Sequence, residues 1–421
     1  MALEKGIAGL VSDFIAAGRP SARARSIDER RAGYIASASL AGETETRVRV
    51  EDVTLEGVTL RIFSPLEANG KLPALIYYHG GCFISGGFAT HDKQLRQLAW
   101  YSGCRVIAVQ YRLAPEHRWP AAHDDALRGA EVIWKNAERL NIDSQRITLA
   151  GDSAGGHLAL VTALRLKAAA VWQPAQLVLI YPMLDATVYF DSYSFNGSDY
   201  VITRDALLSG YEIYLGDTDR LLSDVSPLWR DDFAGLPPVH IITAEFDPLC
   251  DEGEALYQHM TEQGVTCTCS RYLGVIHGFF QLAGISQSAR DVIQDVAARV
   301  ARIKPKGESM SVVSPVEQQF AAYNAHDIEA FVTCFSEDFT AYRLPSTSPS
   351  LQGREALRAF YVEHRFNNPA LRAELLSRTV MGNKVFDHEK IYGIGESVIE
   401  NMAVYEVQDG RIITAWFFFA Q

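Results

Sequence analysis

The chain has 421 residues, of which 48% are hydrophobic and 21% are charged, and its formal net charge is −12. A single hydrophobic core stops growing at about 250–300 residues, so this length predicts two domains. The ordinary composition argues against a disordered, collagen-like or coiled-coil chain, and the acidic balance argues against nucleic acid or an anionic membrane as a partner.

The N-terminal stretch, residues 1–18, places its apolar side chains on one helical face and interrupts them with Asp13. This pattern predicts an amphipathic helix rather than a secretory signal. No apolar run approaches the roughly 20 residues needed to cross a bilayer. Six cysteines are too few for a disulfide scaffold, and none belongs to a CxxC pair typical of structural zinc. We therefore expect a cytoplasmic protein with no metal and no other cofactor.

From about residue 47 to about residue 304, short apolar runs alternate with helical patterns. The strand candidates are 74–78, 106–110, 147–150, 177–180, 239–243 and 267–272, and the helix candidates are 91–101, 122–139, 154–168 and 253–264. Nearly continuous apolar runs are typical of strands covered on both faces. The alternation predicts an α/β domain over residues 1–303, with a mostly parallel sheet between helices. Two segments outside it, about 1–45 and 184–235, are interpreted as one cap.

A turn between a strand and a helix carries the first candidate catalytic group. Gly151-Asp152-Ser153-Ala154-Gly155 has the form G-x-S-x-G, and it joins the run at 147–150 to the helix at 154–168. A serine at such a turn is strained, and bulk two residues before or after it would clash. The turn exposes the Ser153 hydroxyl and directs the Ala154 N–H toward a developing oxyanion. A serine that only caps a helix is the alternative, which this context disfavours.

An acid and a base follow Ser153 in the order nucleophile, acid, base that hydrolases of this architecture use. Asp247 comes just after the run at 239–243, at the end of a parallel strand where functional groups gather. Asp251 is its local competitor and fits a turn or a helix start better. His277 lies beside a glycine after the run at 267–272, where a loop leaves its ring free to reach the site. We predict that Asp247 orients His277, which activates Ser153.

The segment 77–83 (YYHGGCF) follows the first strand candidate. Its successive small residues let backbone N–H groups point into a site. His79 precedes the nucleophile in the chain, so we interpret it as a residue that orders this loop rather than as a second base. Cys82 has no apparent base, which favours a packing role over a reactive thiol.

Five motifs in this order resemble the hormone-sensitive-lipase family of α/β-hydrolases, and more closely its bacterial esterase branch. They are HGGCF at 79–83, YRLAPEH at 111–117, GDSAGG at 151–156, EFDPLCDEG at 245–253 and GVIHGF at 274–279. The resemblance covers about residues 1–303 and implies a two-part cap over an acyl pocket, together with the same triad. It also implies that the oxyanion hole is formed by N–H groups of Gly80, Gly81, Cys82 and Ala154. Cys82 replaces the family's third glycine, which keeps the N–H but changes the pocket wall.

Residues 304–315 contain two prolines, a glycine and three serines, and they predict a linker. Beyond it, helical patterns at 316–324, 328–335 and 354–364 precede strand-like runs at 373–381, 384–394, 397–407 and 411–420. Asp409–Gly410 predicts a hairpin turn between the last two runs. This order predicts a smaller α+β domain with an antiparallel sheet over residues 316–421.

Three segments of this second domain resemble the nuclear transport factor 2-like superfamily, which has a cone-shaped fold and includes polyketide-cyclase-like enzymes and non-catalytic modules. They are YNAHD at 323–327, FSEDF at 335–339 and YEVQDGRI at 405–412. Asp327 and Asp338 fit helix caps or turns better than catalytic bases. His388 and Glu400 could face the cone's cavity, but the alternation of residues alone does not decide which face of each strand points inward.

We predict a serine carboxylesterase that hydrolyses short-chain acyl esters of small molecules through an acyl-enzyme on Ser153. An amide or lactone hydrolase with the same triad is one alternative, and a two-activity enzyme whose C-terminal domain isomerises or cyclises the product is another. A binding protein that has lost catalysis is disfavoured by the intact triad. The run at 411–420 can fill the cone with one face only, so its other aromatic face needs a partner. The partner is either the hydrolase domain of the same chain or this domain of a second chain, and the second, a homodimer, is favoured.

Overall fold

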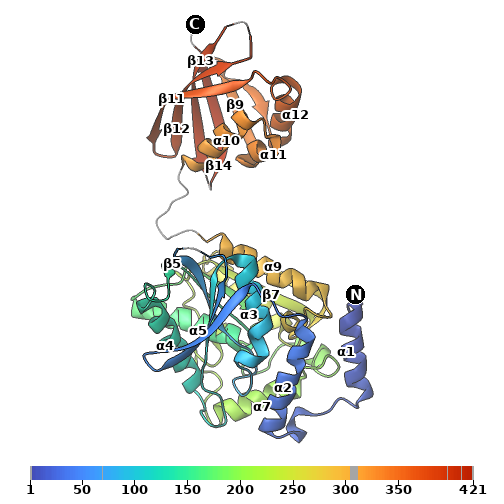
Figure 1. Ribbon diagram of the computed structural model, residues 1–421. Helices are drawn as coiled ribbons and strands as arrows, with labels where there is room; N and C mark the ends of the chain where they lie inside the picture. The colour runs from blue at the N-terminus through green and yellow to red at the C-terminus, as the bar shows by residue number, and fades with distance from the viewer. Residues whose placement is uncertain (1, 69, 304–311, 396, 409, 420–421) are drawn as a thin grey trace. The chain divides into compact units, whose positions relative to one another are not determined.

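The computed structural model describes residues 2–68, 70–303, 312–395, 397–408 and 410–419 (Figure 1). Its contacts divide the chain into two compact units, Met1–Lys306 and Gly307–Gln421. Most of the expected linker, residues 304–311, lies outside the described residues, and Ser314 already begins a helix. Among the described residues, no helix combines the length and the apolar character that crossing a membrane requires.

The first unit is built on an eight-stranded sheet in the order β1-β2-β4-β3-β5-β6-β7-β8. The strands are β1 (Val48–Leu55), β2 (Val58–Pro65), β3 (Leu72–Tyr78), β4 (Arg105–Val109), β5 (Ile142–Asp152), β6 (Gln176–Ile180), β7 (Val239–Phe246) and β8 (Cys267–Ile276). All neighbouring pairs from β4 to β8 are parallel, and β1 and β2 form an antiparallel hairpin at one edge. The predicted mostly parallel sheet is therefore confirmed.

Helices cover both faces of this sheet, as the apolar strand runs predict. They are α3 (Phe88–Ser102), α4 (Ala121–Lys135), α5 (Ala154–Ala169), α8 (Cys250–Glu262) and α9 (Gln287–Ala301). Alternate residues of β3 enter two different cores: Ile76 packs with residues of α4, α5 and α8, whereas Leu75 packs with residues of α3 and α9. The carboxyl ends of β5, β7 and β8 thus project from a sheet that is packed on both sides.

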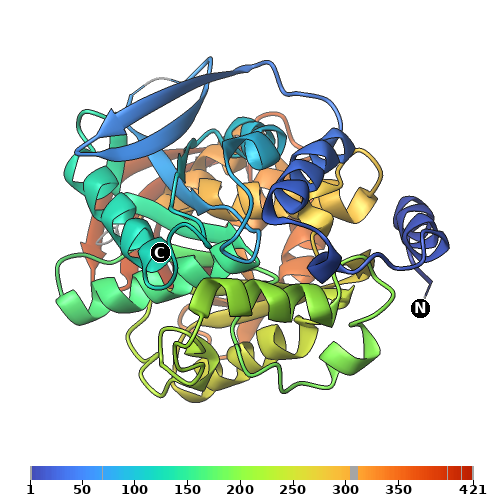
Figure 2. The ribbon, with the colours of Figure 1, turned by 90° about the horizontal axis from the view of Figure 1, so that it is seen from below.

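The two segments outside the alternation meet each other. The first contains α1 (Lys5–Ala16), the short 3-10 helices η1 (Ala22–Ala24) and η2 (Ala38–Ala41), and α2 (Ile27–Ser37), and the second contains α6 (Ser192–Phe195), α7 (Arg204–Leu215) and η3 (Pro227–Trp229). Arg23 forms ion pairs with Asp205 and Glu212 of α7, and Arg30 donates to Ser209. Figure 2 shows η1 lying against α7. These contacts fit the proposal of a single cap.

The second unit combines three helices with a six-stranded sheet in the order β10-β9-β14-β13-β12-β11. The elements are α10 (Ser314–Ala325), α11 (Ile328–Thr333), α12 (Arg354–His364), β9 (Phe335–Arg343), β10 (Pro349–Gln352), β11 (Arg372–Met381), β12 (Lys384–Tyr392), β13 (Ile399–Gln408) and β14 (Arg411–Phe419). The predicted α+β fold is confirmed. The expectation of a wholly antiparallel sheet is wrong at one pair, because β14 runs parallel to β9. Asp409 of the expected turn lies outside the described residues.

The strand positions correct the expectation for Asp338 and decide the open question of His388 and Glu400. Asp327 caps α11 as predicted, since its side chain accepts a hydrogen bond from the Ala330 N–H. Asp338, in contrast, lies within β9 and is exposed. His388 and Glu400 bond to each other, 2.8 Å apart and partly exposed, and neither lines the cavity. Successive side chains of a strand point to opposite faces of the sheet. On β12, the side chain that lines the cavity of this domain is therefore that of Glu389, the residue after His388.

Candidate active site

Ser153 lies at the sharp turn between β5 and α5, with φ of 55° and ψ of −118°. A side chain on Gly155 would bring its Cβ within 1.9 Å of the Tyr78 carbonyl oxygen, and a side chain on Gly151 would come within 2.3 Å of Gly155. Any larger residue at either position would therefore break the turn. The strained backbone holds the hydroxyl beyond the end of the sheet, as a nucleophile requires.

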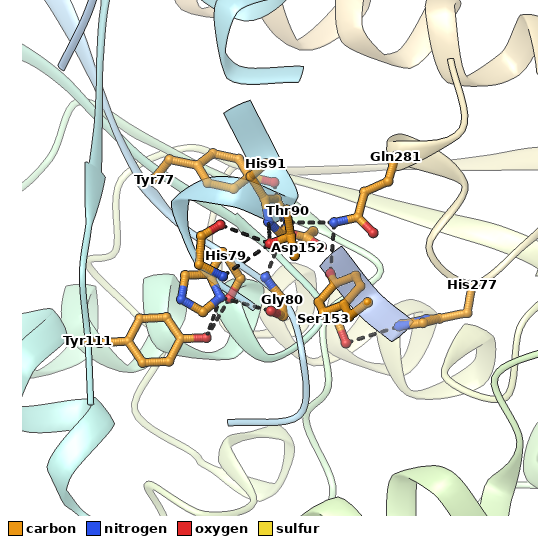
Figure 3. Close-up of polar contacts among 12 residues, drawn as sticks. Tyr77, His79, Gly80, Thr90, His91, Tyr111, Asp152, Ser153, His277 and Gln281 are labelled. Carbon is orange, nitrogen blue, oxygen red and sulfur yellow. Dashed lines mark hydrogen bonds and ion pairs between the residues drawn. The ribbon is translucent and has the colours of Figure 1, made fainter. Parts of the chain in front are cut away.

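The structure brings the three predicted triad residues together. His277 follows β8, and its Nε2 lies 3.0 Å from the Ser153 Oγ (Figure 3). Its Nδ1 lies 2.8 Å from Oδ2 of Asp247, a fully buried residue just after β7. The other oxygen of Asp247 accepts a hydrogen bond from the Leu249 N–H. A carboxylate at Nδ1 favours the tautomer whose Nε2 is free to accept the serine proton.

The competing carboxylate has a different position and different partners. Asp251 lies in the first turn of α8, where the sequence places a helix start. Its carboxylate accepts a hydrogen bond from the backbone N–H of Ser192, in the second cap segment. Asp251 therefore joins the cap to α8, whereas Asp247 contacts the imidazole of His277.

The loop after β3 provides backbone N–H groups, although not all of those expected. The N–H of Gly80 donates to Oδ1 of Asp152 at 2.9 Å, so it is already in use. The N–H groups of Gly81 and Cys82 have no acceptor among the described residues. The N–H of Ala154 lies in the first turn of α5, where helical N–H groups lack an intrahelical acceptor. Of the four expected N–H groups, those of Gly81, Cys82 and Ala154 therefore stay available to a bound molecule.

The buried carboxylate of Asp152 contacts several groups of the site. In the sequence it is only the variable residue before Ser153 in G-x-S-x-G. Besides the Gly80 N–H, its Oδ1 accepts from the Tyr77 hydroxyl at 2.9 Å, and it lies 3.0 Å from Nε2 of His91 (Figure 3). Burial alone would raise the pKa of Asp152, but His91 and the Tyr77 hydroxyl outweigh it and lower the pKa. An ionised Asp152 thus fixes the loop after β3 to the turn that carries Ser153.

His79 has the loop-ordering contacts that the sequence predicts for it. Its Nδ1 lies 2.8 Å from the Gly80 carbonyl oxygen and 3.1 Å from the hydroxyl of Tyr111, which also donates to the His79 carbonyl. Burial, with the nearby His91, lowers the pKa of His79 to about 3. A neutral ring bound to its own loop is poorly suited to act as a second base.

Cys82 packs against the cap. A Cβ on Gly210 of α7 would lie 2.6 Å from the Cys82 Cβ, so the cysteine fills space that a glycine on the facing helix leaves open. Burial raises the pKa of the Cys82 thiol to about 11, which makes it a poor nucleophile at neutral pH. The cysteine therefore fills the space between the loop after β3 and α7.

Known proteins share this architecture. A family model described as alpha/beta hydrolase fold matches residues 75–281. The ethyl acetate hydrolase of Pseudomonas putida is 36% identical, over 62% of this chain and 85% of that protein. A carboxylesterase of Mycobacterium tuberculosis is 33% identical, over 59% of this chain and 80% of its own length. The chain belongs to the α/β-hydrolase family.

Solved structures and the second family model agree with this assignment. An ester hydrolase from the Lake Arreo metagenome superposes with a TM-score of 0.67 and 35% identity, covering 71% of this chain and 98% of that one. A hyperthermophilic esterase from Pyrobaculum calidifontis gives a TM-score of 0.65 and 34% identity, covering 72% and 98%. A SnoaL-like domain matches residues 316–415. The protein is thus a carboxylic ester hydrolase of the α/β-hydrolase family, fused to a SnoaL-like domain.

The contacts of Asp152 with Tyr77, Gly80 and His91 lead to a testable expectation for this hydrolase. The Asp152→Asn substitution keeps the size of the side chain but removes the charge that holds His91 and the Gly80 N–H together. We expect kcat to fall by about 10- to 100-fold with a smaller change in KM, because a loosened oxyanion loop affects the transition state most. Steady-state ester kinetics test this expectation. An unchanged kcat would mean that Asp152 does not position the loop.

Proposed function

We propose that the hydrolase domain cleaves esters of short acyl chains through an acyl-enzyme on Ser153. The observation that carries the proposal is the hydrogen-bonded chain Ser153–His277–Asp247, with distances of 3.0 and 2.8 Å. His277 accepts the serine proton as Oγ attacks the ester carbonyl, and it then gives this proton to the departing alcohol. Water attacks the acyl-enzyme in the second half of the reaction, with His277 again as the base.

Charge that develops on the carbonyl oxygen needs donors that are already in place. In the proposed mechanism these are the N–H groups of Gly81, Cys82 and Ala154. Asp247 orients His277 and stabilises the imidazolium that forms in each half-reaction.

Two observations support a preference for short acyl chains. The relatives found for this chain include an ethyl acetate hydrolase and several acetyl esterases. The Cys82 side chain also adds bulk beside the oxyanion loop, against Gly210 of the cap. Both favour a small acyl group.

Chain-length preference is tested with p-nitrophenyl esters from acetate to laurate. We expect kcat/KM to be highest between acetate and butyrate and to fall by about 10-fold or more for laurate. A matched series of p-nitroanilides separates this activity from amide hydrolysis, for which we expect much lower kcat/KM. A maximum at long chains would contradict the short-chain proposal, and comparable rates on anilides would favour the amidase alternative.

We also propose that the enzyme is a homodimer paired through its SnoaL-like domain. On β14, Trp416 and Phe418 face away from the cavity that Phe417 lines, and Phe418 is 44% exposed. Met402, directly opposite Phe418 on β13, is 37% exposed. Exposed apolar side chains clustered on one sheet face favour an interface between copies.

Light scattering tests the dimer in the full chain. Replacing both Met402 and Phe418 by lysine is expected to give a monomer, because like charges would then meet across the symmetric interface. Ester kinetics should not change, since these residues belong to the other unit. A variant that remains dimeric would place the interface elsewhere.

A further inference from the structure

The SnoaL-like domain contains a cavity of its own. Its volume is about 390 Å³, within the range of roughly 300–1,000 Å³ that small-molecule pockets occupy. Its walls are mostly apolar and rich in aromatic rings, and they come from α10, α11, α12 and the facing sheet; the rings include Phe331, Phe335, Phe339, Tyr361, Tyr405 and Phe417. Such walls accommodate a flat or bulky apolar body rather than bulk water.

Two buried polar side chains interrupt this apolar wall on the sheet side. Glu389 of β12 and Asn401 of β13 are directly opposite each other, and both line the cavity. They are 4% and 2% exposed. Oε1 of Glu389 and both amide atoms of Asn401 have no hydrogen-bond partner in the described part of the chain. Buried polar atoms nearly always have partners, so atoms without one at a cavity wall point to an external ligand.

The charges around Glu389 determine what it can bind. Arg378, the arginine whose charge acts on Glu389, already binds Asp387 through two bonds of 2.7 Å. Burial first, and then the neighbouring Asp387, raise the pKa of Glu389 to about 8, and Arg378 lowers it only in part. At neutral pH the side chain is therefore mainly the uncharged acid, which donates a hydrogen bond. The Asn401 amide adds a second donor and an acceptor beside it.

Two arginines also line the cavity. Arg343 lies over the ring of Phe419 at 5.9 Å, and Arg365 lies over Phe360 at 5.1 Å. Arg343 is exposed and Arg365 half-buried, whereas Glu389 and Asn401 are buried. The cations are thus at the solvent side, and the uncharged donors are at the inner wall.

We propose that this cavity binds a neutral, largely apolar small molecule through one carbonyl or hydroxyl oxygen held between Glu389 and Asn401. The aromatic walls enclose its apolar body. The proposal concerns binding and assigns no reaction to the domain, so it is independent of the ester chemistry at Ser153.

Calorimetric titration of the full chain with 2-acetylnaphthalene tests this proposal. This probe has a flat apolar body and one carbonyl group. We expect saturable binding that weakens by about 10-fold or more when Glu389 and Asn401 are both replaced by leucine, because the carbonyl then loses its donors. Glu389→Gln should retain affinity, since its amide still donates. The matched control is the double variant His388→Leu and Glu400→Leu, which changes the neighbouring residues on the other sheet face.

A second probe, 2-naphthoate, distinguishes the polar group. We expect it to bind at least about 10-fold more weakly, because its charge would be buried beside Glu389. Naphthoate binding as tight as that of the ketone would overturn the proposal in favour of an acid held by Arg343 and Arg365. Absence of ketone binding would overturn it, as would ketone binding that is unchanged in a folded Glu389→Leu, Asn401→Leu variant. Equal loss in the Glu389→Gln variant would assign the effect to packing and would also overturn it.

Discussion

Replacing Ser153 by alanine is expected to lower kcat for ester hydrolysis by several orders of magnitude, up to about 10⁶-fold. In the proposed mechanism the Ser153 hydroxyl forms the acyl bond, with Nε2 of His277 at 3.0 Å. Triad residues act as a unit, so binding and the oxyanion donors would leave only a small residual rate. Steady-state kinetics on p-nitrophenyl acetate measure the loss.

The matched control for this experiment is Ser144→Ala. Ser144 is an exposed residue of β5, the strand that ends at the nucleophile turn. We expect wild-type activity from it. Retention of more than a few per cent of activity in the Ser153→Ala variant would show that the serine mechanism is wrong.

The second large effect is expected at Asp247. The Asp247→Asn substitution presents an amide to Nδ1 of His277 and favours the wrong imidazole tautomer, a change that costs about 10⁴-fold in kcat in a serine protease. The loss should be nearly as large here, because the Asp247 carboxylate is fully buried and lies 2.8 Å from the ring. Comparing kcat with that of the wild type at the same pH measures it.

Asp251→Asn is the control for position. It lies four residues further on, and its carboxylate contacts a backbone N–H of the cap. We expect at most a modest loss of activity. The reverse order of the two variants would assign the role of the acid to Asp251.

Much of the hydrolase fold could be predicted because its central strands are covered on both faces. β3 and β6 are continuous apolar runs, and the strand candidates in the sequence lie within or overlap the strands of the structure. The edge hairpin of β1 and β2 was not predicted as strands, since charged residues interrupt its apolar positions. Its turn, Glu56-Gly57, has positive φ at both residues, which is typical of a two-residue hairpin turn.

In the site, some residues can be predicted from local features of the sequence, whereas the roles of others depend on contacts that form only on folding. The triad follows from chain order and from strand ends, which are local features. The role of Asp152 depends on Tyr77, Gly80 and His91, and only folding brings these together. One available signal was a charged residue two positions after the apolar run at 147–150 and directly before Ser153.

In the SnoaL-like domain, the sequence predicts β11 to β14 but not β9 and β10, and it does not predict which faces of the strands point inward. His388 and Glu400 were candidates for the cavity, yet the buried residues are their neighbours Glu389 and Asn401. A shift of one residue exchanges the two faces of a strand. The alternation of residues therefore does not by itself show which face lines the cavity. β9 was missed because its partner in the sheet is the distant β14, to which it is parallel.

The central claim is that Ser153 forms the covalent intermediate, and a covalent probe tests it most directly. A p-nitrophenyl alkylphosphonate ester mimics the tetrahedral intermediate and leaves a stable phosphonyl group on an activated serine. Peptide mass spectrometry of the inactivated enzyme is predicted to show this group on Ser153, with one equivalent of p-nitrophenol released. Inactivation with the adduct on Cys82 or any other residue, and Ser153 unmodified, would contradict the account.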